Sequence, residues 1–155
     1  MITVLFVCLG NICRSPMAEA VFQQLVTEAG LADKIKVDSA GTGGWHVGEA
    51  AHTGTRRVLQ AHGIAYHGRA RQVSTQDTAA PNNWIIAMDK QNKADLQRRF
   101  GQHPRLHLLL DFAENHPTVS DVPDPYYTNN FEYVYELVKD GCEGLLTHIR
   151  QIEGI

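Results

Sequence analysis

The fold is decided by one stretch near the start of the chain, Val7-Cys8-Leu9-Gly10-Asn11-Ile12-Cys13-Arg14-Ser15-Pro16. Residues 2–7 are apolar almost throughout, as central parallel strands covered on both faces are. Residues 17–25 have helical spacing, with Ser15 suited to the cap of that helix and Pro16 to its first turn. A buried strand therefore passes through a short turn into a helix, and Cys8 stands where the strand ends.

A turn of this kind forms an anion site, because it aims backbone N–H groups and the positive end of a helix dipole at one point. These groups and Arg14 favour the thiolate form of Cys8. The alternative is an inert core cysteine, since free cysteine is often buried. The combination of Cys, Arg and Ser at a strand-to-helix junction favours a phosphate-binding loop. Its members are Leu9, Gly10, Asn11, Ile12, Cys13, Arg14 and Ser15.

The composition is that of an ordinary globular domain. The 155 residues are 43% hydrophobic and 20% charged, with a net charge of −3 and a pI near 6.2. These values give no support to a nucleic-acid or anionic-membrane partner. No apolar run approaches a membrane span or a signal peptide, so we expect a cytoplasmic protein. Three cysteines, an odd number, argue against a disulfide framework.

Strands alternate with helices along the chain. After the helix that Gly30 ends, we expect strands over 35–39, 84–88 and 106–110, helices over 53–62, 74–80, 89–100 and 131–152, a glycine-rich loop over 40–48 and a long loop over 111–129. This order predicts one α/β domain over residues 1–155: a doubly wound three-layer sandwich with a central four-stranded parallel sheet and helices on both faces. Ligands in such sheets bind beyond the carboxyl ends of the strands.

A thiolate beside a bound phosphate is placed to attack phosphorus, and Arg14 matches two phosphate oxygens. The leaving oxygen then needs an acid, which Arg14 cannot be because it stays charged. Asp124 is the best candidate, since two prolines stiffen its loop and two tyrosines follow it. A plain turn aspartate is the alternative. Four other aspartates are not excluded by spacing: Asp38, Asp89, Asp111 and Asp121.

The stretch from Val7 to Pro16 resembles the signature of the low-molecular-weight protein tyrosine phosphatases. Three further segments resemble the same family, so the likeness covers essentially the whole chain: Asp38-Ser39-Ala40-Gly41-Thr42, Ala87-Met88-Asp89 and Asp124-Pro125-Tyr126-Tyr127. The resemblance implies a metal-independent phosphotyrosine phosphatase that needs no cofactor. It implies Cys8 as nucleophile, Arg14 as phosphate clamp and Asp124 as general acid and then base.

The resemblance also implies supporting roles around the loop. A hydrogen-bond network holding the loop would consist of Asn11, Ser15, Ser39 and His67. Trp45 and Tyr126, with Tyr127 beside them, would wall the cleft and select phosphotyrosine. One departure concerns peptide preference, because His52 stands where relatives often carry an acid. Bacterial relatives often act on tyrosine kinases of polysaccharide export, which makes such a kinase a candidate partner.

Cys13 lies in the same turn as Cys8, close enough to act as a resolving thiol. We expect oxidation of Cys8 to give a reversible Cys8–Cys13 disulfide, against the alternative of a packed loop cysteine. Cys142 is expected in the core. The eight histidines are scattered, with no zinc-type spacing, so we expect no metal site.

Three other functions compete. An arsenate reductase needs two more redox cysteines, and none lies between Cys13 and Cys142. Protein-arginine phosphatases of the same family carry Thr where Ile12 stands, so Ile12 favours tyrosine. A module that only binds phosphotyrosine would have no use for a thiolate or for Asp124.

Overall fold

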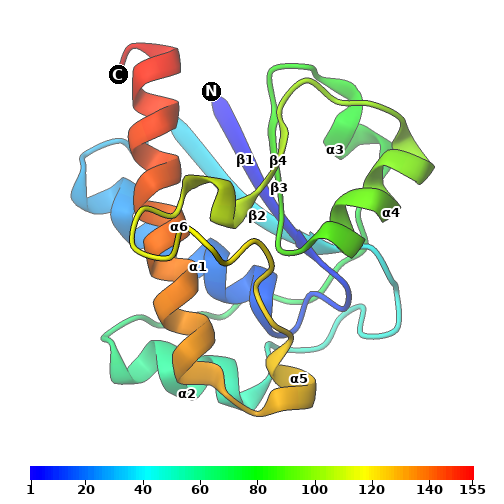
Figure 1. Ribbon diagram of the computed structural model, residues 1–155, viewed down its shortest axis with the longest axis vertical. Coiled ribbons are helices and arrows are strands. Elements are labelled where there is room, and N and C mark those ends of the chain that lie inside the picture. Colours follow the sequence, from blue (N-terminus) through cyan, green and yellow to red (C-terminus); the bar gives the residue numbers. More distant parts are fainter.

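A four-stranded parallel sheet forms the middle layer of the protein, which a computed structural model describes over residues 1–155 (Figure 1). Its strands are β1 (Ile2–Cys8), β2 (Ile35–Gly41), β3 (Trp84–Ala87) and β4 (Leu106–Leu108). They lie in the order β2-β1-β3-β4, and every neighbouring pair is parallel. The predicted four-stranded parallel sheet is therefore confirmed.

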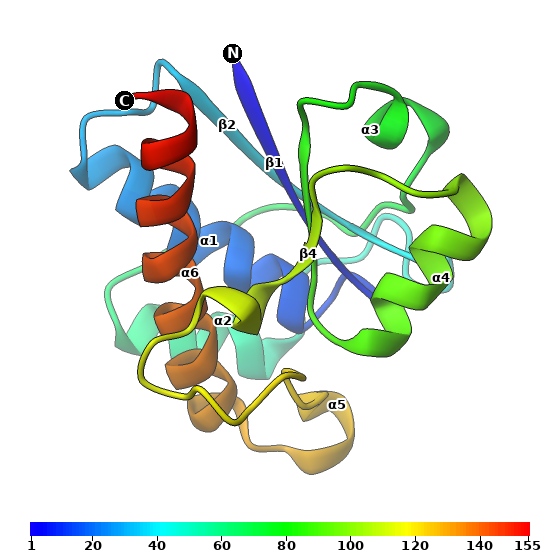
Figure 2. The same cartoon turned by 45° about the horizontal axis from the view of Figure 1, so that its top comes forward.

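Helices cover both faces of this sheet (Figures 1 and 2). One face carries α1 (Arg14–Glu28), α2 (Thr53–Ala61) and α6 (Phe131–Glu153), and the other carries α3 (Thr75–Ala79) and α4 (Lys90–Phe100). The alternation of β1 produces the two cores, because successive side chains of a strand point to opposite faces. Val4 and Phe6 enter the larger core with α1 and α6, whereas Leu5 and Val7 enter the smaller one with Leu96. The three-layer α/β sandwich is confirmed.

The strand order places a ligand site at a defined edge. β1 pairs with β2 on one side and with β3 on the other, so the connections that follow β1 and β2 cross the sheet in opposite directions. Ligands of open α/β sheets bind at such a switch point, beyond the carboxyl ends of the strands. Cys8 ends β1 there, and Asp89 follows β3 at the same edge.

Three local predictions are wrong. Helix α1 begins at Arg14 with Cys13 as its cap, because the Ser15 hydroxyl contacts Cys8 instead of capping. Strand β4 ends at Leu108, where the Asp111 carboxylate accepts the Leu108 N–H at 3.2 Å and a 3-10 turn, η1 (Leu109–Phe112), follows. The expected loop over 111–129 contains a short helix, α5 (Pro125–Thr128), which Asp124 caps.

The remaining helix ends agree with the sequence to within a residue or two. Asp89 caps α4 by accepting the Asn92 N–H at 2.7 Å, as predicted. Gly30 and Gly63 follow α1 and α2 with φ of 72° and 78°, a left-handed conformation that favours glycine at helix ends. None of the helices is both long and apolar enough to cross a membrane.

Candidate active site

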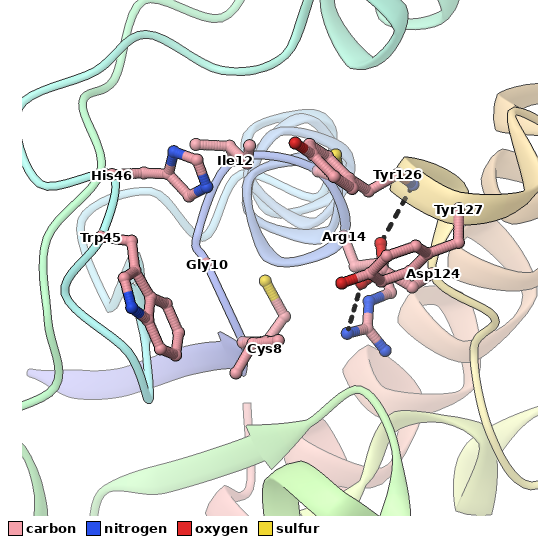
Figure 3. Close-up of a pocket in the computed structure, with 11 residues that line it drawn as sticks. Cys8, Gly10, Ile12, Arg14, Trp45, His46, Asp124, Tyr126 and Tyr127 are labelled. Carbon is pink, nitrogen blue, oxygen red and sulfur yellow. Dashed lines mark hydrogen bonds and ion pairs between the residues drawn. The ribbon is translucent and has the colours of Figure 1, made fainter.

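Cys8 lies at the floor of a cavity of about 260 Å³ between the first loop and the loop before α5. Figure 3 shows its sulfur facing this cavity, with Trp45 and His46 on one side and Asp124 and Tyr127 on the other. The Asn11 N–H donates to Cys8 Sγ at 3.3 Å, and Ser15 Oγ lies 3.0 Å from the same sulfur.

The loop between β1 and α1 exposes its backbone donors. Its carbonyls are bonded by surrounding segments: Cys8 O accepts from Thr42 N at 2.9 Å and Ile12 O from His52 N at 2.7 Å. The N–H groups of Gly10, Ile12 and Cys13 take part in no hydrogen bond within the protein. Three backbone donors, together with the start of α1, are therefore available to an anion beside Cys8.

Arg14 is the positive group of the site and is only 3% exposed. Its guanidinium donates to Asp89 Oδ2 at 2.5 Å, to Val122 O at 3.0 Å and to Asp124 Oδ2 at 3.5 Å. Burial alone would lower the pKa of Arg14, but attraction to Cys8, Asp89 and Asp124 outweighs it and raises that pKa. The side chain is thus a permanently charged group in a fixed orientation.

The structure separates Asp124 from the four competing aspartates, since it alone among them lines the cavity. Asp89 uses one oxygen on Arg14 and the other on Asn92 N. Asp38, Asp111 and Asp121 bind Arg71, Leu108 N and Lys90 N respectively. Asp124 Oδ1 accepts the Tyr126 N–H at 3.1 Å, which aims the carboxylate from the end of α5 toward Arg14.

The rim of the cavity is aromatic and exposed. Trp45 is 72% exposed, Tyr126 55% and Tyr127 78%, and all three line the cavity together with Ile12. His46 also lines it, a residue that the sequence analysis missed; its Nδ1 lies 2.9 Å from Glu49. Exposed aromatic side chains around a polar floor provide a slot for a flat group.

His52 contacts both the loop between β1 and α1, by donating its N–H to Ile12 O, and the segment around α5, through Tyr126. Its Nδ1 accepts the Gly54 N–H at 2.9 Å, so it caps α2. Its ring stacks on Phe131 with centroids 5.0 Å apart and meets Tyr126 edge-on at 6.1 Å. His52 is not among the residues lining the cavity.

Three of the four predicted supporting residues come together. Asn11 has φ 58° and donates through Nδ2 to Ser15 Oγ at 2.8 Å and to Ser39 Oγ at 3.0 Å. His67 lies outside this network: it is exposed and makes no hydrogen bond. Its neighbour Tyr66 reaches the network instead, by donating to Glu19 at 2.9 Å. Glu19 and Tyr66 were both missed, because nothing in their spacing marks them.

Cys13 is buried in the same loop and lines the cavity, and no disulfide is formed by any cysteine. Cys142 is fully buried in the larger core. No group of three or more His, Cys, Asp or Glu side chains is arranged to hold a metal ion.

A parallel α/β sheet that presents a cysteine and a buried arginine in one loop with free backbone donors is suited to binding a phosphate group, as a phosphatase must. Comparison with known proteins supplies the family. Residues 3–153 match the family model described as low molecular weight phosphotyrosine protein phosphatase. The chain belongs to this family, as its sequence predicted, and is a phosphatase.

Individual relatives cover the whole chain. The low molecular weight protein-tyrosine-phosphatase YfkJ of Bacillus subtilis is 53% identical over 97% of both chains, and its crystal structure superposes with a TM-score of 0.92. PtpA of Staphylococcus epidermidis is 47% identical over 96% of this chain and 94% of its own. A protein tyrosine phosphatase of Entamoeba histolytica, solved with Hepes in the active site, is 36% identical over 99% of both chains with a TM-score of 0.88.

Proposed function

We propose that this phosphatase hydrolyses phosphotyrosine in proteins through a cysteinyl-phosphate intermediate. Cys8 is the nucleophile, Arg14 the phosphate clamp, and Asp124 the general acid and then the general base. The observation that carries the proposal is the convergence of these three side chains on one cavity with an aromatic rim. It is supported by the names of the relatives, which are protein-tyrosine-phosphatases.

The first step is attack of the Cys8 thiolate on phosphorus, which forms an S–P bond as the P–O bond to tyrosine breaks. The N–H groups of Gly10, Ile12 and Cys13 and the guanidinium of Arg14 receive the phosphate oxygens. Arg14 would release Asp124, its more distant partner at 3.5 Å, and keep Asp89 at 2.5 Å. Preorganised donors of this kind stabilise the charge that develops in the transition state.

Asp124 gives its proton to the departing phenolate oxygen, and its carboxylate then accepts a proton from water. That water attacks phosphorus and the S–P bond breaks. Inorganic phosphate is released and the Cys8 thiolate is regenerated. Since Arg14 and the backbone N–H groups carry the charge of the phosphate, the proposed reaction needs no metal ion. We therefore expect EDTA to leave the rate unchanged.

The rim favours phosphotyrosine over phosphoserine. Trp45, Tyr126 and Tyr127 stand above the floor of the cavity, so the phosphate must be carried down on a long, flat group. A tyrosine kinase of polysaccharide export is one such protein substrate. Three free cysteines fit a reducing compartment, and we place the activity in the cytoplasm on that ground.

The test is hydrolysis of p-nitrophenyl phosphate and of matched phosphotyrosine, phosphoserine and phosphoarginine peptides. Cys8→Ser is expected to abolish turnover. Asp124→Ala is expected to lower kcat by about 10²–10⁴-fold on a phenyl ester with a poor leaving group. A wild-type chain that binds the phosphotyrosine peptide but does not turn it over would be a binding module, and faster hydrolysis of phosphoarginine would contradict the choice of tyrosine.

A further inference from the structure

A chain of hydrogen bonds leads from a half-buried carboxylate on α1 to the sulfur of Cys8. Glu19 Oε1 accepts from Ser39 Oγ at 2.5 Å and from the Tyr66 phenol at 2.9 Å. We propose that Tyr66 is a positioning residue for catalysis, which acts through Glu19 and Ser39 to hold Asn11 and Ser15 in place beside Cys8. This inference rests on the proposed role of Cys8 as nucleophile.

The direction of each bond follows from the donors available. Ser39 spends its only hydroxyl hydrogen on Glu19, so its oxygen must act as acceptor toward Asn11 Nδ2, 3.0 Å away. The Asn11 amide cannot be flipped, because its Oδ1 accepts the Arg71 N–H at 3.0 Å.

The second hydrogen of Asn11 Nδ2 goes to Ser15 Oγ at 2.8 Å. Ser15 Oγ therefore accepts from Asn11 and can give its own hydrogen to Cys8 Sγ at 3.0 Å, the nearer of two acceptors, since Ala40 O lies 3.5 Å away. A negative carboxylate at Glu19 thus holds the Ser39 oxygen in place as the acceptor of one Asn11 hydrogen, and Asn11 gives its other hydrogen to Ser15 beside the sulfur.

Gly68 leaves the space in which the Tyr66 phenol reaches the Glu19 carboxylate. A Cβ on Gly68 would lie 2.2 Å from the Tyr66 oxygen, so the phenol fills the space that any other residue at position 68 would need. The neighbouring His67 is exposed and forms no hydrogen bond with the loop. A substitution at Gly68 would therefore move the phenol without changing either partner of the bond.

Loss of the Tyr66 hydroxyl is expected to change the pKa of Glu19 and with it the pH dependence of activity. Burial raises the pKa of Glu19, while the bonds from Ser39 and Tyr66 act in the opposite direction. The other charged or titratable groups around it are Asp38, which raises that pKa, Arg71, which lowers it, and His67, which lines the same surface groove. Without the phenol hydroxyl the pKa of Glu19 rises further. Protonated Glu19 no longer fixes Ser39, so activity is lost at a higher pH than in the wild type.

The experiment measures kcat and KM for p-nitrophenyl phosphate from about pH 4.5 to pH 8, together with the rate of Cys8 alkylation by iodoacetate. The variants are Tyr66→Phe, which keeps the ring, Gly68→Ala, Glu19→Gln and the double variant Glu19→Gln/Tyr66→Phe. Tyr133→Phe on α6 is the matched control, because its hydroxyl makes no hydrogen bond. Urea unfolding of each variant reports stability separately.

We expect Tyr66→Phe and Gly68→Ala to lower kcat by about tenfold with little change in KM, and to move the acid limb of the profile to higher pH. Glu19→Gln has no carboxylate to titrate, so adding Tyr66→Phe to it should cost almost nothing more. A Tyr66→Phe enzyme with wild-type kcat, or with an unshifted acid limb, would overturn the proposal, as would additive losses in the double variant. An inactive wild type would instead refute the proposed function.

Discussion

Cys13 lies in the same loop as Cys8, but its surroundings disfavour a thiolate. Burial and the negative charges of Asp124 and Cys8 raise the pKa of Cys13 to about 12, and Arg14 offsets this only in part. Cys13 is therefore a neutral thiol at the pH of any assay, so it contributes no charge to phosphate binding.

The expected outcome for Cys13→Ser is a kcat within about twofold of the wild type under reducing conditions, since a neutral thiol and a hydroxyl are close isosteres. After mild peroxide the two should differ. Peroxide converts the Cys8 thiolate to a sulfenic acid, and attack by Cys13 then forms the disulfide and releases water. In Cys13→Ser the sulfenic acid has no partner, and further peroxide oxidises it to a sulfinic acid that thiols do not reduce. Dithiothreitol should therefore restore the wild type but not Cys13→Ser.

Because Cys13 attacks as a thiolate, bridging should accelerate as pH rises toward the raised pKa of about 12. Peptide mass mapping after peroxide treatment at two pH values measures this directly. A lasting sulfinic acid on wild-type Cys8, without a bridged peptide, would show that Cys13 is only a packed residue.

Sequence reasoning finds the residues that belong to a motif and misses those that reach the site from elsewhere. Cys8 and Arg14 are recognisable because their spacing at a strand-to-helix junction has a chemical meaning. Glu19 looks like any polar residue of α1, and only the fold shows that it is packed against Ser39 and Tyr66. The resemblance implied His67, whereas Tyr66 is the residue that reaches the network; both lie in an irregular segment, where no periodicity shows which side chain points inward.

At the scale of elements, the long helix α6 packs against η1 through two glycines. A Cβ on Gly141 would lie 3.0 Å from the Leu109 carbonyl oxygen, and one on Gly144 only 1.8 Å from that of Phe112. Glycine in the middle of a helix costs about 1 kcal/mol relative to alanine. The close approach of two backbones explains why this helix retains both.

Whether Gly144→Ala lowers or raises the free energy of unfolding tests this packing. Gly144→Ala should destabilise the protein by about 1–3 kcal/mol, because backbone atoms cannot move aside as a side chain can. Glu143→Ala, one residue earlier and exposed, is the control and should change little. Urea midpoints give both values, and a more stable Gly144→Ala protein would mean that η1 yields and that its position is not fixed by α6.

Element boundaries were predictable where a local signal exists. Helix α6 was found from the spacing of its apolar residues and α4 from Asp89 at its cap. The end of β4 was not, because three leucines follow one another and the turn depends on Asp111 reaching back to Leu108 N. Helix α5 was also missed, since four residues are too few to show a period.

At the scale of the whole molecule, the alternation of strands and helices was enough to predict the sheet and its active edge. The alternation was not enough to predict which charged side chains form ion pairs at that edge. Arg14 meets Asp89 and Asp124 over separations of 75 and 110 residues. Only the order β2-β1-β3-β4 brings these segments together, and spacing in the sequence alone excluded none of the four aspartates that competed with Asp124.

The same long-range pairing stabilises the face of the sheet opposite α1, where Arg71 joins β2 to α3. Its guanidinium contacts Asp38 Oδ2 and both oxygens of Asp77 at 2.9–3.0 Å. Burial alone would raise the pKa of Asp77, but hydrogen bonds from Arg71 and Ser74 outweigh it and lower that pKa below its ordinary 3.8.

A carboxyl whose folded pKa is lowered stabilises the fold above its unfolded pKa, and this contribution is lost as pH falls through the folded value. We therefore expect Asp77→Asn to be less stable than the wild type at pH 7 by about 1 kcal/mol, a value reduced for the partial exposure of the pair. The difference should shrink below about pH 4 and vanish once the wild-type carboxyl is protonated. Urea unfolding at a series of pH values measures it, with the exposed Asp33→Asn as control. A difference that persists unchanged into acid would mean that Asp77 acts through its shape at the start of α3, and that its charge pairing with Arg71 contributes nothing to stability.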